Sequence, residues 1–303
     1  MKVEALKSEK INDFIDYCKK HRNEIDGSYL YDEEINEFMP NKENPTYILT
    51  NKQGKMVGAA SLIMDDYNQR GRTARFRILH SQKKNRKCFQ LLLQSILNHT
   101  KGLDKIFLFI PVKNKPLSKS VEQLGFTVER YSFLMVREDL DVPKVTFPSD
   151  YTIKTFRSGK DEEIWCKVRN AGFANLKGSE APITPDNVKK MVSSDDYLEG
   201  GMKILFHKDK PVGVVRGAAD KHEDEPILNI GPLAILPEYQ GKGLGRTLLR
   251  ASLQFARDNF YKKTILSVNG ENEGAKELYR KEGFKEADAF TCYQLVLKSR
   301  TDL

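Results

Sequence analysis

Apolar residues in this chain recur with two periods, and segments of the two kinds alternate. Short apolar runs, for example residues 56–64, 105–112 and 227–236, have the length and composition of strands, whereas residues 89–97 and the stretch after residue 246 repeat apolar side chains at helical spacing. This alternation predicts an α/β (α+β, mixed-sheet) fold, in which twisted, mostly antiparallel sheets are flanked by helices.

The predicted elements come in the same order twice. In the first half we expect strands at 3–6, 47–50, 56–64, 75–79, 105–112 and 131–137, and helices at 8–18, 32–39, 89–97 and 117–124. In the second half we expect strands at 151–156, 202–206, 212–219, 227–236, 264–268 and 291–297, and helices at 161–173, 184–192, 246–260 and 272–283. Pro143 and Pro148 mark a linker at 141–150, which predicts domains at 1–142 and 143–303.

The stretch between residues 227 and 284 contains the most informative pattern. A predicted strand ends at Pro237, the sequence Gln240-Gly-Lys-Gly-Leu-Gly-Arg246 follows, and a helix then begins whose apolar positions, ending at Phe260, predict one buried face. The first N–H groups of a helix have no internal partner, and the helix dipole adds partial positive charge there. Glycines before the helix allow an anion to approach the backbone closely. The stretch therefore predicts a phosphate site, with a plain tight turn as the alternative.

Neither of two common phosphate loops fits this sequence. A Walker loop needs Ser or Thr after Gly-Lys, but Gly243 follows Lys242. The dinucleotide pattern G-x-G-x-x-G needs glycine where Arg246 stands.

Two motifs resemble those of the GNAT acetyltransferase superfamily. Gln240-x-x-Gly243-x-Gly245 is similar to the Q/R-x-x-G-x-G/A loop of that family, and Asn272-x-x-Ala-x-x-Leu-Tyr279 followed by Gly283-Phe284 is similar to its second motif. The resemblance covers residues 151 to 298. It implies an acyl-CoA donor, expected to be acetyl-CoA, with its pyrophosphate on the loop and its pantetheine along the preceding strand.

The resemblance also implies roles for individual residues. Tyr279 is the expected general acid, which would protonate the departing thiolate, and packing beside Leu278 is its alternative role. Backbone groups near Leu233 and Ile235 would pair with the pantetheine, and Pro232, which has no N–H, suits a strand that leaves its neighbour. Asn272 would cap its helix, bind the cofactor or do both. The expected cofactor-binding residues are Leu233, Ile235, Gln240, Gly241, Lys242, Gly243, Leu244, Gly245, Arg246 and Asn272.

The two halves also align with each other. Asn114 and Gly125 precede Asn272 and Gly283 by the same offset of 158 residues (272 − 114 and 283 − 125). At that offset Gly243 falls on Asn85, Gly245 on Lys87 and Tyr279 on Val121. The chain therefore resembles a tandem GNAT protein whose first copy has kept the fold and lost the cofactor site.

Composition narrows the expectations further. Hydrophobic residues make up 39% and charged residues 30% of the 303 residues, and no run reaches the roughly 18 apolar residues of a membrane span. The net charge of +8 comes without a dense basic tract, so we expect neither nucleic acid nor membrane as a partner. No signal peptide is visible and the four cysteines are scattered, which favours a reducing cytoplasm and no metal site.

The leading functional hypothesis is transfer of an acyl group, expected to be acetyl, from CoA to the primary amine of a small molecule. The alternatives are an acyl or aminoacyl transferase for a larger acceptor such as a peptide, as in tandem peptidoglycan bridge enzymes, and a CoA-binding sensor without turnover. Mycothiol synthases are also tandem, but nothing beyond this layout favours them. The acceptor and the oligomeric state (monomer or homodimer) stay open. So does the general base, among Glu180, Asp220, His222, Glu223, Asp224 and Glu225.

Overall fold

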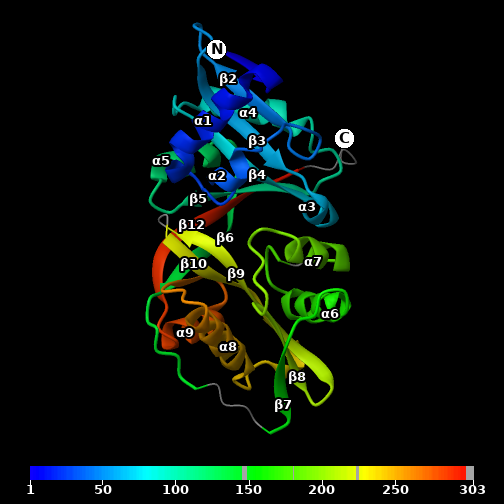
Figure 1. Ribbon diagram of the computed structural model, residues 1–303. Helices are drawn as coiled ribbons and strands as arrows, with labels where there is room; N and C mark the ends of the chain where they lie inside the picture. Colours follow the sequence, from blue (N-terminus) through cyan, green and yellow to red (C-terminus); the bar gives the residue numbers. More distant parts are fainter. Residues whose placement is uncertain (145–148, 180, 223–224, 298–303) are drawn as a thin grey trace. The chain divides into compact units, whose positions relative to one another are not determined.

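A computed structural model describes residues 1–144, 149–179, 181–222 and 225–297 (Figure 1). These residues form two compact units. Unit 1 is Met1–Ser132 together with the segment that begins at Ala289, and unit 2 is Phe133–Asp288.

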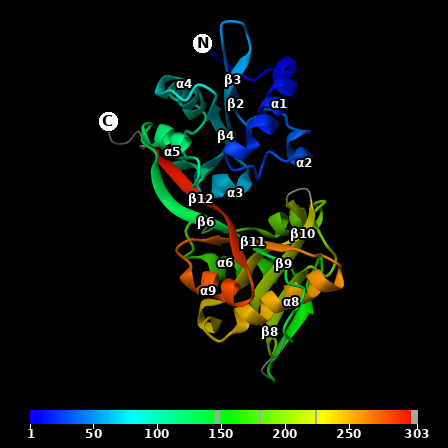
Figure 2. The same cartoon turned by 90° about the vertical axis from the view of Figure 1, so that its left-hand side faces the viewer.

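Unit 1 is a sheet with helices on both faces. Its strands follow the order β1-β2-β3-β4-β5, and β12 lies next to β5. Helices α1 and α4 lie on opposite sides of the β2–β4 strands (Figure 2). The elements are β1 Lys2–Ala5, α1 Ile11–His21, α2 Asp32–Ile35, β2 Thr46–Thr50, β3 Met56–Ile63, α3 Asp66–Arg70, β4 Thr73–Ser81, α4 Arg86–Leu97, β5 Lys105–Pro111 and α5 Lys115–Glu122, with 3-10 turns η1 Ser8–Lys10 and η2 Arg22–Glu24.

Unit 2 repeats this arrangement. Its strands follow the order β11-β10-β9-β8-β7, and α6 and α8 lie on opposite sides of β9 and β10 (Figure 1). The elements are β7 Tyr151–Thr155, α6 Glu162–Phe173, α7 Pro185–Val192, β8 Met202–His207, β9 Lys210–His222, β10 Glu225–Ile235, α8 Leu244–Asp258, β11 Thr264–Asn269 and α9 Glu273–Lys281, with the 3-10 turn η3 Pro237–Tyr239.

Two long strands contribute to both units. Strand β6 (Thr127–Arg137) begins in unit 1 and ends in unit 2, whereas β12 (Lys285–Val296) begins in unit 2 and ends in unit 1. In unit 1, β12 pairs antiparallel with β5 from Phe290 opposite Pro111 to Val296 opposite Lys105. The compact units therefore differ from the continuous ranges 1–142 and 143–303, which remain a prediction about the chain's functional halves. Residues 145–148 of the expected linker lie outside the described residues.

The predicted repeat is confirmed at the level of single hydrogen bonds. Asn114 and Asn272 both precede their helices with φ of −88°, and the side-chain oxygen of each accepts a hydrogen bond from the backbone N–H three residues later, at 3.3 and 3.1 Å. After each helix a glycine adopts positive φ, 92° at Gly125 and 87° at Gly283. The same local sequence logic therefore starts and ends both helices.

Several predicted details differ from the structure. Helix α1 begins at Ile11 without a side-chain cap, and Ser8 instead starts the 3-10 turn. Helix α2 covers only Asp32–Ile35. Helix α8 ends at Asp258, and the chain turns away through positive φ, which leaves Phe260 92% exposed rather than buried. The short helix α3 was not predicted, since a single turn has no apolar period.

Each unit buries the apolar faces that the sequence pattern marked. In unit 1, Phe14 of α1, Leu92 of α4 and Ile48 and Leu49 of β2 are fully inaccessible to solvent. Burial of one such side chain stabilises the fold by about 1.5–3 kcal/mol. The segment of β12 in unit 1 joins this core through Tyr293, which is 4% exposed and whose hydroxyl donates to Glu122 at 2.9 Å.

We expect Tyr293→Ala to lower the free energy of unfolding of unit 1 by about 3–5 kcal/mol, because it removes a large buried side chain. The control is Val296→Ala in the same strand, where the side chain is 65% exposed and the change should stay within about 0.5 kcal/mol. Urea unfolding followed by circular dichroism measures the loss, while the emission of Trp165, the one tryptophan of the chain, follows unit 2. Equal stability of the two variants would contradict the place of β12 in the core of unit 1.

Candidate active site

Strand β10 parts from β11 in the middle of unit 2. The two strands pair in parallel only at Leu228 opposite Thr264 and Asn229 opposite Ile265. Beyond Asn229, the register of β10 against β9 shifts by one residue between Ile230 and Leu233. Because a bulge turns the strand, the backbone of residues 233–235 continues along β9 and, among the described residues, does not pair with β11. The expectation of a strand that leaves its neighbour near Pro232 thus agrees with the described pairing.

The loop after β10 folds back onto the end of the strand. The Gln240 side-chain amide donates to the Ile235 carbonyl at 3.0 Å, and the Leu236 N–H donates to the Val212 carbonyl of β9 at 2.9 Å. The Gln240 side chain therefore holds the loop in place. This structural use of the glutamine is compatible with contact between the loop backbone and a ligand.

Gly241 and Gly243 give the loop its conformation. Their φ angles are 74° and 77°, in the left-handed region that residues with a Cβ rarely adopt. A Cβ at either position would find no protein atom within 4 Å. The loop therefore has open space in front of its backbone, and the conformation, not packing, requires glycine there.

Helix α8 begins directly after Gly243 without a side-chain cap. The residue before the helix is this glycine, and the first turn contains no acidic side chain. In unit 1 the helix that begins at the same offset, α4, is capped by Asn85, whose side-chain oxygen accepts from the Cys88 N–H at 3.0 Å. The N-terminus of α8 therefore remains available to an anion, whereas the matching end of α4 is bound by the protein itself.

Three of the predicted segments meet at Gly245. A Cβ at this position would lie 3.7 Å from Leu278 of α9 and 3.9 Å from Leu233 of β10. Leu244 is buried, so its side chain anchors the helix start while its N–H belongs to the first turn. The structure thus brings the loop, the parted strand and the second motif together.

The two basic side chains of the loop have partners within the protein. Lys242 Nζ lies 4.9 Å from the centre of the Tyr239 ring, and Arg246 Nε lies 3.1 Å from a carboxylate oxygen of Glu282. Arg246 is 43% exposed, so part of its guanidinium faces solvent. Asn272 caps α9, as expected from the sequence. Its expected contact with the cofactor remains a prediction.

Tyr279 is buried in α9. It is 8% exposed, and its ring lies 5.9 Å from that of Phe284. Burial raises the pKa of its hydroxyl to about 12, so the phenol keeps its proton at neutral pH. The hydroxyl is therefore present as a proton donor at that pH, not as a phenolate.

Sequence reasoning missed the residues that fix the second motif against the loop. Glu282 is 5% exposed, and its two oxygens accept from Arg250 of α8 at 2.7 and 2.8 Å. Gly172 of α6 was also missed, although a Cβ there would come within 3.0 Å of Ala234 and of the Ile235 carbonyl. The sequence offered two weak signals for these contacts, namely the opposite charges of Arg250 and Glu282 and a glycine, Gly172, inside a predicted helix. Neither signal belongs to a motif.

Three of the expected general bases lie outside the described residues, namely Glu180, Glu223 and Asp224. The other three lie at the end of β9 or the start of β10, where Glu225 pairs with His222 and Asp220 accepts from Asn229 at 2.8 Å. At about 3.3 Å per residue, Glu225 is roughly 25 Å along β10 from Leu233. None of the three is therefore assigned to the site.

All four cysteines are free and buried, and burial raises the pKa of Cys292 to about 12. A thiol that stays protonated is a poor nucleophile. In the part of the chain that the structure describes, no helix has the length and apolar character needed to traverse a bilayer.

Comparisons with known proteins bear on this site. The profile of the acetyltransferase (GNAT) family matches residues 174–284, which contain the loop and the second motif. A mycothiol acetyltransferase of Acidothermus cellulolyticus is 29% identical over 208 residues, 64% of this chain and 63% of that protein. One of Catenulispora acidiphila is 29% identical over 175 residues, 56% of this chain and 55% of that protein. The chain therefore matches less than two thirds of the length of these curated relatives.

Solved structures share the fold over the whole chain. A GCN5-related N-acetyltransferase from Sphaerobacter thermophilus has a TM-score of 0.74 at 16% identity, covering 100% of this chain and 97% of that one. A tandem GNAT protein from the clavulanic acid biosynthesis pathway has a TM-score of 0.68 at 12% identity, covering 98% and 99%. The fold of the chain is thus that of a tandem GNAT protein, and residues 174–284 match the profile of the GNAT acetyltransferase family.

Proposed function

We propose that the protein is an N-acetyltransferase that transfers an acetyl group from acetyl-CoA to the primary amine of a small molecule. The observation that carries this proposal is the uncapped start of α8, which follows two glycines of positive φ and open space at the end of a parted strand. This arrangement suits the pyrophosphate of CoA, which carries negative charge and several acceptor oxygens.

The gap between β10 and β11 would receive the pantetheine arm. In the described part of the chain, the backbone groups of residues 233–235 that face away from β9 pair with no strand, so they are available to the amides of the ligand. An N–H there would also polarise the thioester carbonyl as the amine attacks it. Leu233 and Leu278, which meet at Gly245, would exclude water from one side of the arm.

Tyr279 would act as the general acid. Attack by the neutral amine forms the new C–N bond, the C–S bond breaks, and the electron pair leaves on sulfur. The phenol would give its proton to that thiolate, whose pKa is close to the value of about 8.5 for a cysteine thiol. The proton lost by the amine has no assigned side-chain acceptor, so solvent would receive it.

The relatives' name, mycothiol acetyltransferase, supports an amine related to mycothiol as the first acceptor to test. A larger acceptor or a CoA sensor without turnover remains the alternative. An assay for free thiol, run with acetyl-CoA over a panel of amines, distinguishes these functions, because a sensor releases no thiol with any of them.

Gly243→Asn should weaken binding of acetyl-CoA by about 10–100-fold. The new side chain would occupy the space in front of the helix start, and the loss corresponds to one charge-assisted hydrogen bond. Calorimetric titration measures the affinity. Gly159→Asn is the matched control, since Gly159 has φ of 77° and open space in the same unit but lies outside the loop. Equal affinities of the two variants would remove the helix start from the site.

Tyr279→Phe should lower kcat by about 10²–10⁴-fold, the usual contribution of a general acid, and leave the affinity for acetyl-CoA unchanged. In the wild-type enzyme the raised pKa predicts that this acid remains protonated above pH 10, the ordinary value for a phenol. Steady-state rates of thiol release from pH 7 upward measure both effects. A wild-type kcat in the variant would leave the tyrosine with a packing role.

A titration of the whole chain with a non-hydrolysable acetyl-CoA analogue should give one site per chain. Asn85 occupies the matching helix start in unit 1, and buried Val121 stands at the position of Tyr279. Gly243→Asn should lower the occupancy of this single site at a ligand concentration that only just saturates the wild type. A stoichiometry of two would instead mean that unit 1 also binds the donor.

A further inference from the structure

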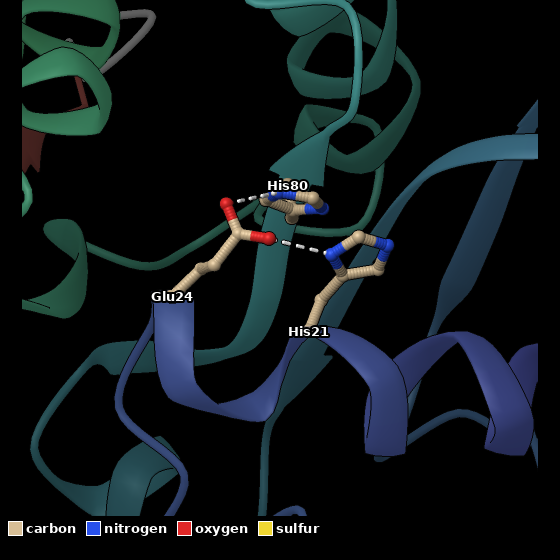
Figure 3. A group of neighbouring side chains, drawn as sticks. All are labelled: His21, Glu24 and His80. Atoms are coloured by element: carbon tan, nitrogen blue, oxygen red, sulfur yellow. Dashed lines mark hydrogen bonds and ion pairs between the residues drawn. The ribbon is translucent and has the colours of Figure 1, made fainter.

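A second cluster of reactive side chains lies in unit 1. It joins His21 at the end of α1, Glu24 in the following 3-10 turn and His80 in β4 (Figure 3). No metal site was expected from the sequence, because the four cysteines are scattered. The three residues of this cluster form no motif, since His80 is 59 positions after His21 (80 − 21). The group lies outside the site proposed for acetyl-CoA, which belongs to unit 2.

Potential ligand atoms converge in this cluster. Nδ1 of His21 lies 2.7 Å from Oε1 of Glu24, Nε2 of His80 lies 3.5 Å from Oε2, and one ligand atom of each residue falls within 4.8 Å of the others. Tetrahedral coordination at about 2.0–2.1 Å separates ligand atoms by about 3.3 Å. The two separations, which involve different oxygens of Glu24, lie on either side of that value, and side-chain rotations would bring the three ligand atoms around one ion.

Each imidazole is also held through its other nitrogen. Nδ1 of His80 lies 2.7 Å from the hydroxyl of buried Tyr17, and Nε2 of His21 lies 3.2 Å from the side-chain amide of Gln82. Histidines that bind metals donate the N–H of the second ring nitrogen to an acceptor. The Tyr17 oxygen can accept in this way from His80, whereas the Gln82 amide faces His21 with its nitrogen and would have to turn its oxygen to that ring when Nδ1 binds a metal. If Nδ1 of His80 donates to Tyr17, its Nε2 carries the lone pair that faces Glu24.

The His80 Nε2 atom lacks a hydrogen bond although it is buried. His80 is 2% exposed, and this atom has no hydrogen-bond partner among the described residues. A polar atom left in this state is unfavourable unless something binds it. Beside it lies a cavity of about 10 Å³, lined by Glu24, His80, Ser81, Lys84 and Asn114 among others. That volume accommodates about one water molecule or one ion and excludes an organic ligand.

We propose that His21, Glu24 and His80 bind a single divalent transition-metal ion, with Zn²⁺ as the best match. Two imidazoles and one carboxylate are ligands that Zn²⁺ accepts, with water in the fourth position, whereas Mg²⁺ and Ca²⁺ prefer oxygen ligands alone. Lys84, whose Nζ lies 3.8 Å from Glu24, is 52% exposed and free to turn toward solvent as the ion enters. The ion would connect the α1–η2 segment to β4 and so stabilise unit 1.

The test is a titration of the metal-free, full-length protein with Zn²⁺ and, for its spectrum, Co²⁺. We expect one equivalent to bind, a higher melting temperature with Zn²⁺ than with Mg²⁺, and a tetrahedral Co²⁺ spectrum without the charge-transfer band of a cysteine ligand. Failure to bind one equivalent, or a spectrum with that band, would overturn the proposal.

Variants locate the ion. Glu24→Gln and His80→Asn should each abolish the stoichiometric binding, and Glu24→Gln keeps the test valid if the buried His80 variant fails to fold, because Glu24 is 37% exposed at its side chain. His99→Asn is the matched control, since His99 is an exposed histidine of the same unit and should leave one equivalent bound. Retention of the ion by folded Glu24→Gln, or its loss from His99→Asn, would contradict the assignment.

Tyr17→Phe examines the orientation of His80 without removing a ligand. The loss of the hydroxyl that holds Nδ1 should weaken Zn²⁺ binding by about 10–100-fold. Unchanged affinity would mean that Tyr17 does not orient the ligand. Acetyl-CoA binding by the same variants reports on the other unit, so failure of the metal proposal and failure of the proposed function are distinguishable.

Discussion

The separation of β10 from β11 after Asn229 is the constraint on which the proposed site of unit 2 depends. Two parallel strands that stayed paired would leave no backbone groups for a ligand and would direct the following loop elsewhere. Once they part, the Gln240 amide can close the loop on Ile235, and α8 starts with its N–H groups facing open space. Arg250 and Glu282 then hold the second motif against this helix. The position of the loop and the start of α8 therefore both depend on the gap between β10 and β11.

Much of this could be predicted from the sequence, because the signals are local. The glycines, the asparagine caps and the apolar periods each concern residues within a few positions of one another, and they predicted the loop, the two motif helices and the repeat. Partners distant in the chain were not predictable in the same way. Arg246 and Glu282 pair across 36 positions (282 − 246). Likewise, no local pattern in the sequence predicts that β12 pairs with β5.

The two copies of the fold differ in what can accept hydrogen bonds from the first N–H groups of the matching helices, α4 and α8. In unit 1 an asparagine at position 85 accepts such a bond within the protein, and a polar cluster around Glu24 occupies the neighbouring region. In unit 2, Gly243 has no side chain that could accept hydrogen bonds from the first N–H groups of α8, so a ligand can accept them instead. The two helix starts thus differ in whether a side chain of the protein accepts from their N–H groups.

The crossing of β12 into unit 1 has a consequence for the newly made chain. Most of unit 1 has left the ribosome once residue 132 is synthesised, yet the strand that covers β5 arrives about 160 residues later. At about 5–20 residues per second, β5 waits for roughly 8–30 s with one edge lacking this neighbour. The sequence Lys-Ile-Phe-Leu-Phe-Ile-Pro of that strand is apolar, the kind of edge that recruits other chains. Translation speed through the second half thus sets how long the first half is exposed to aggregation.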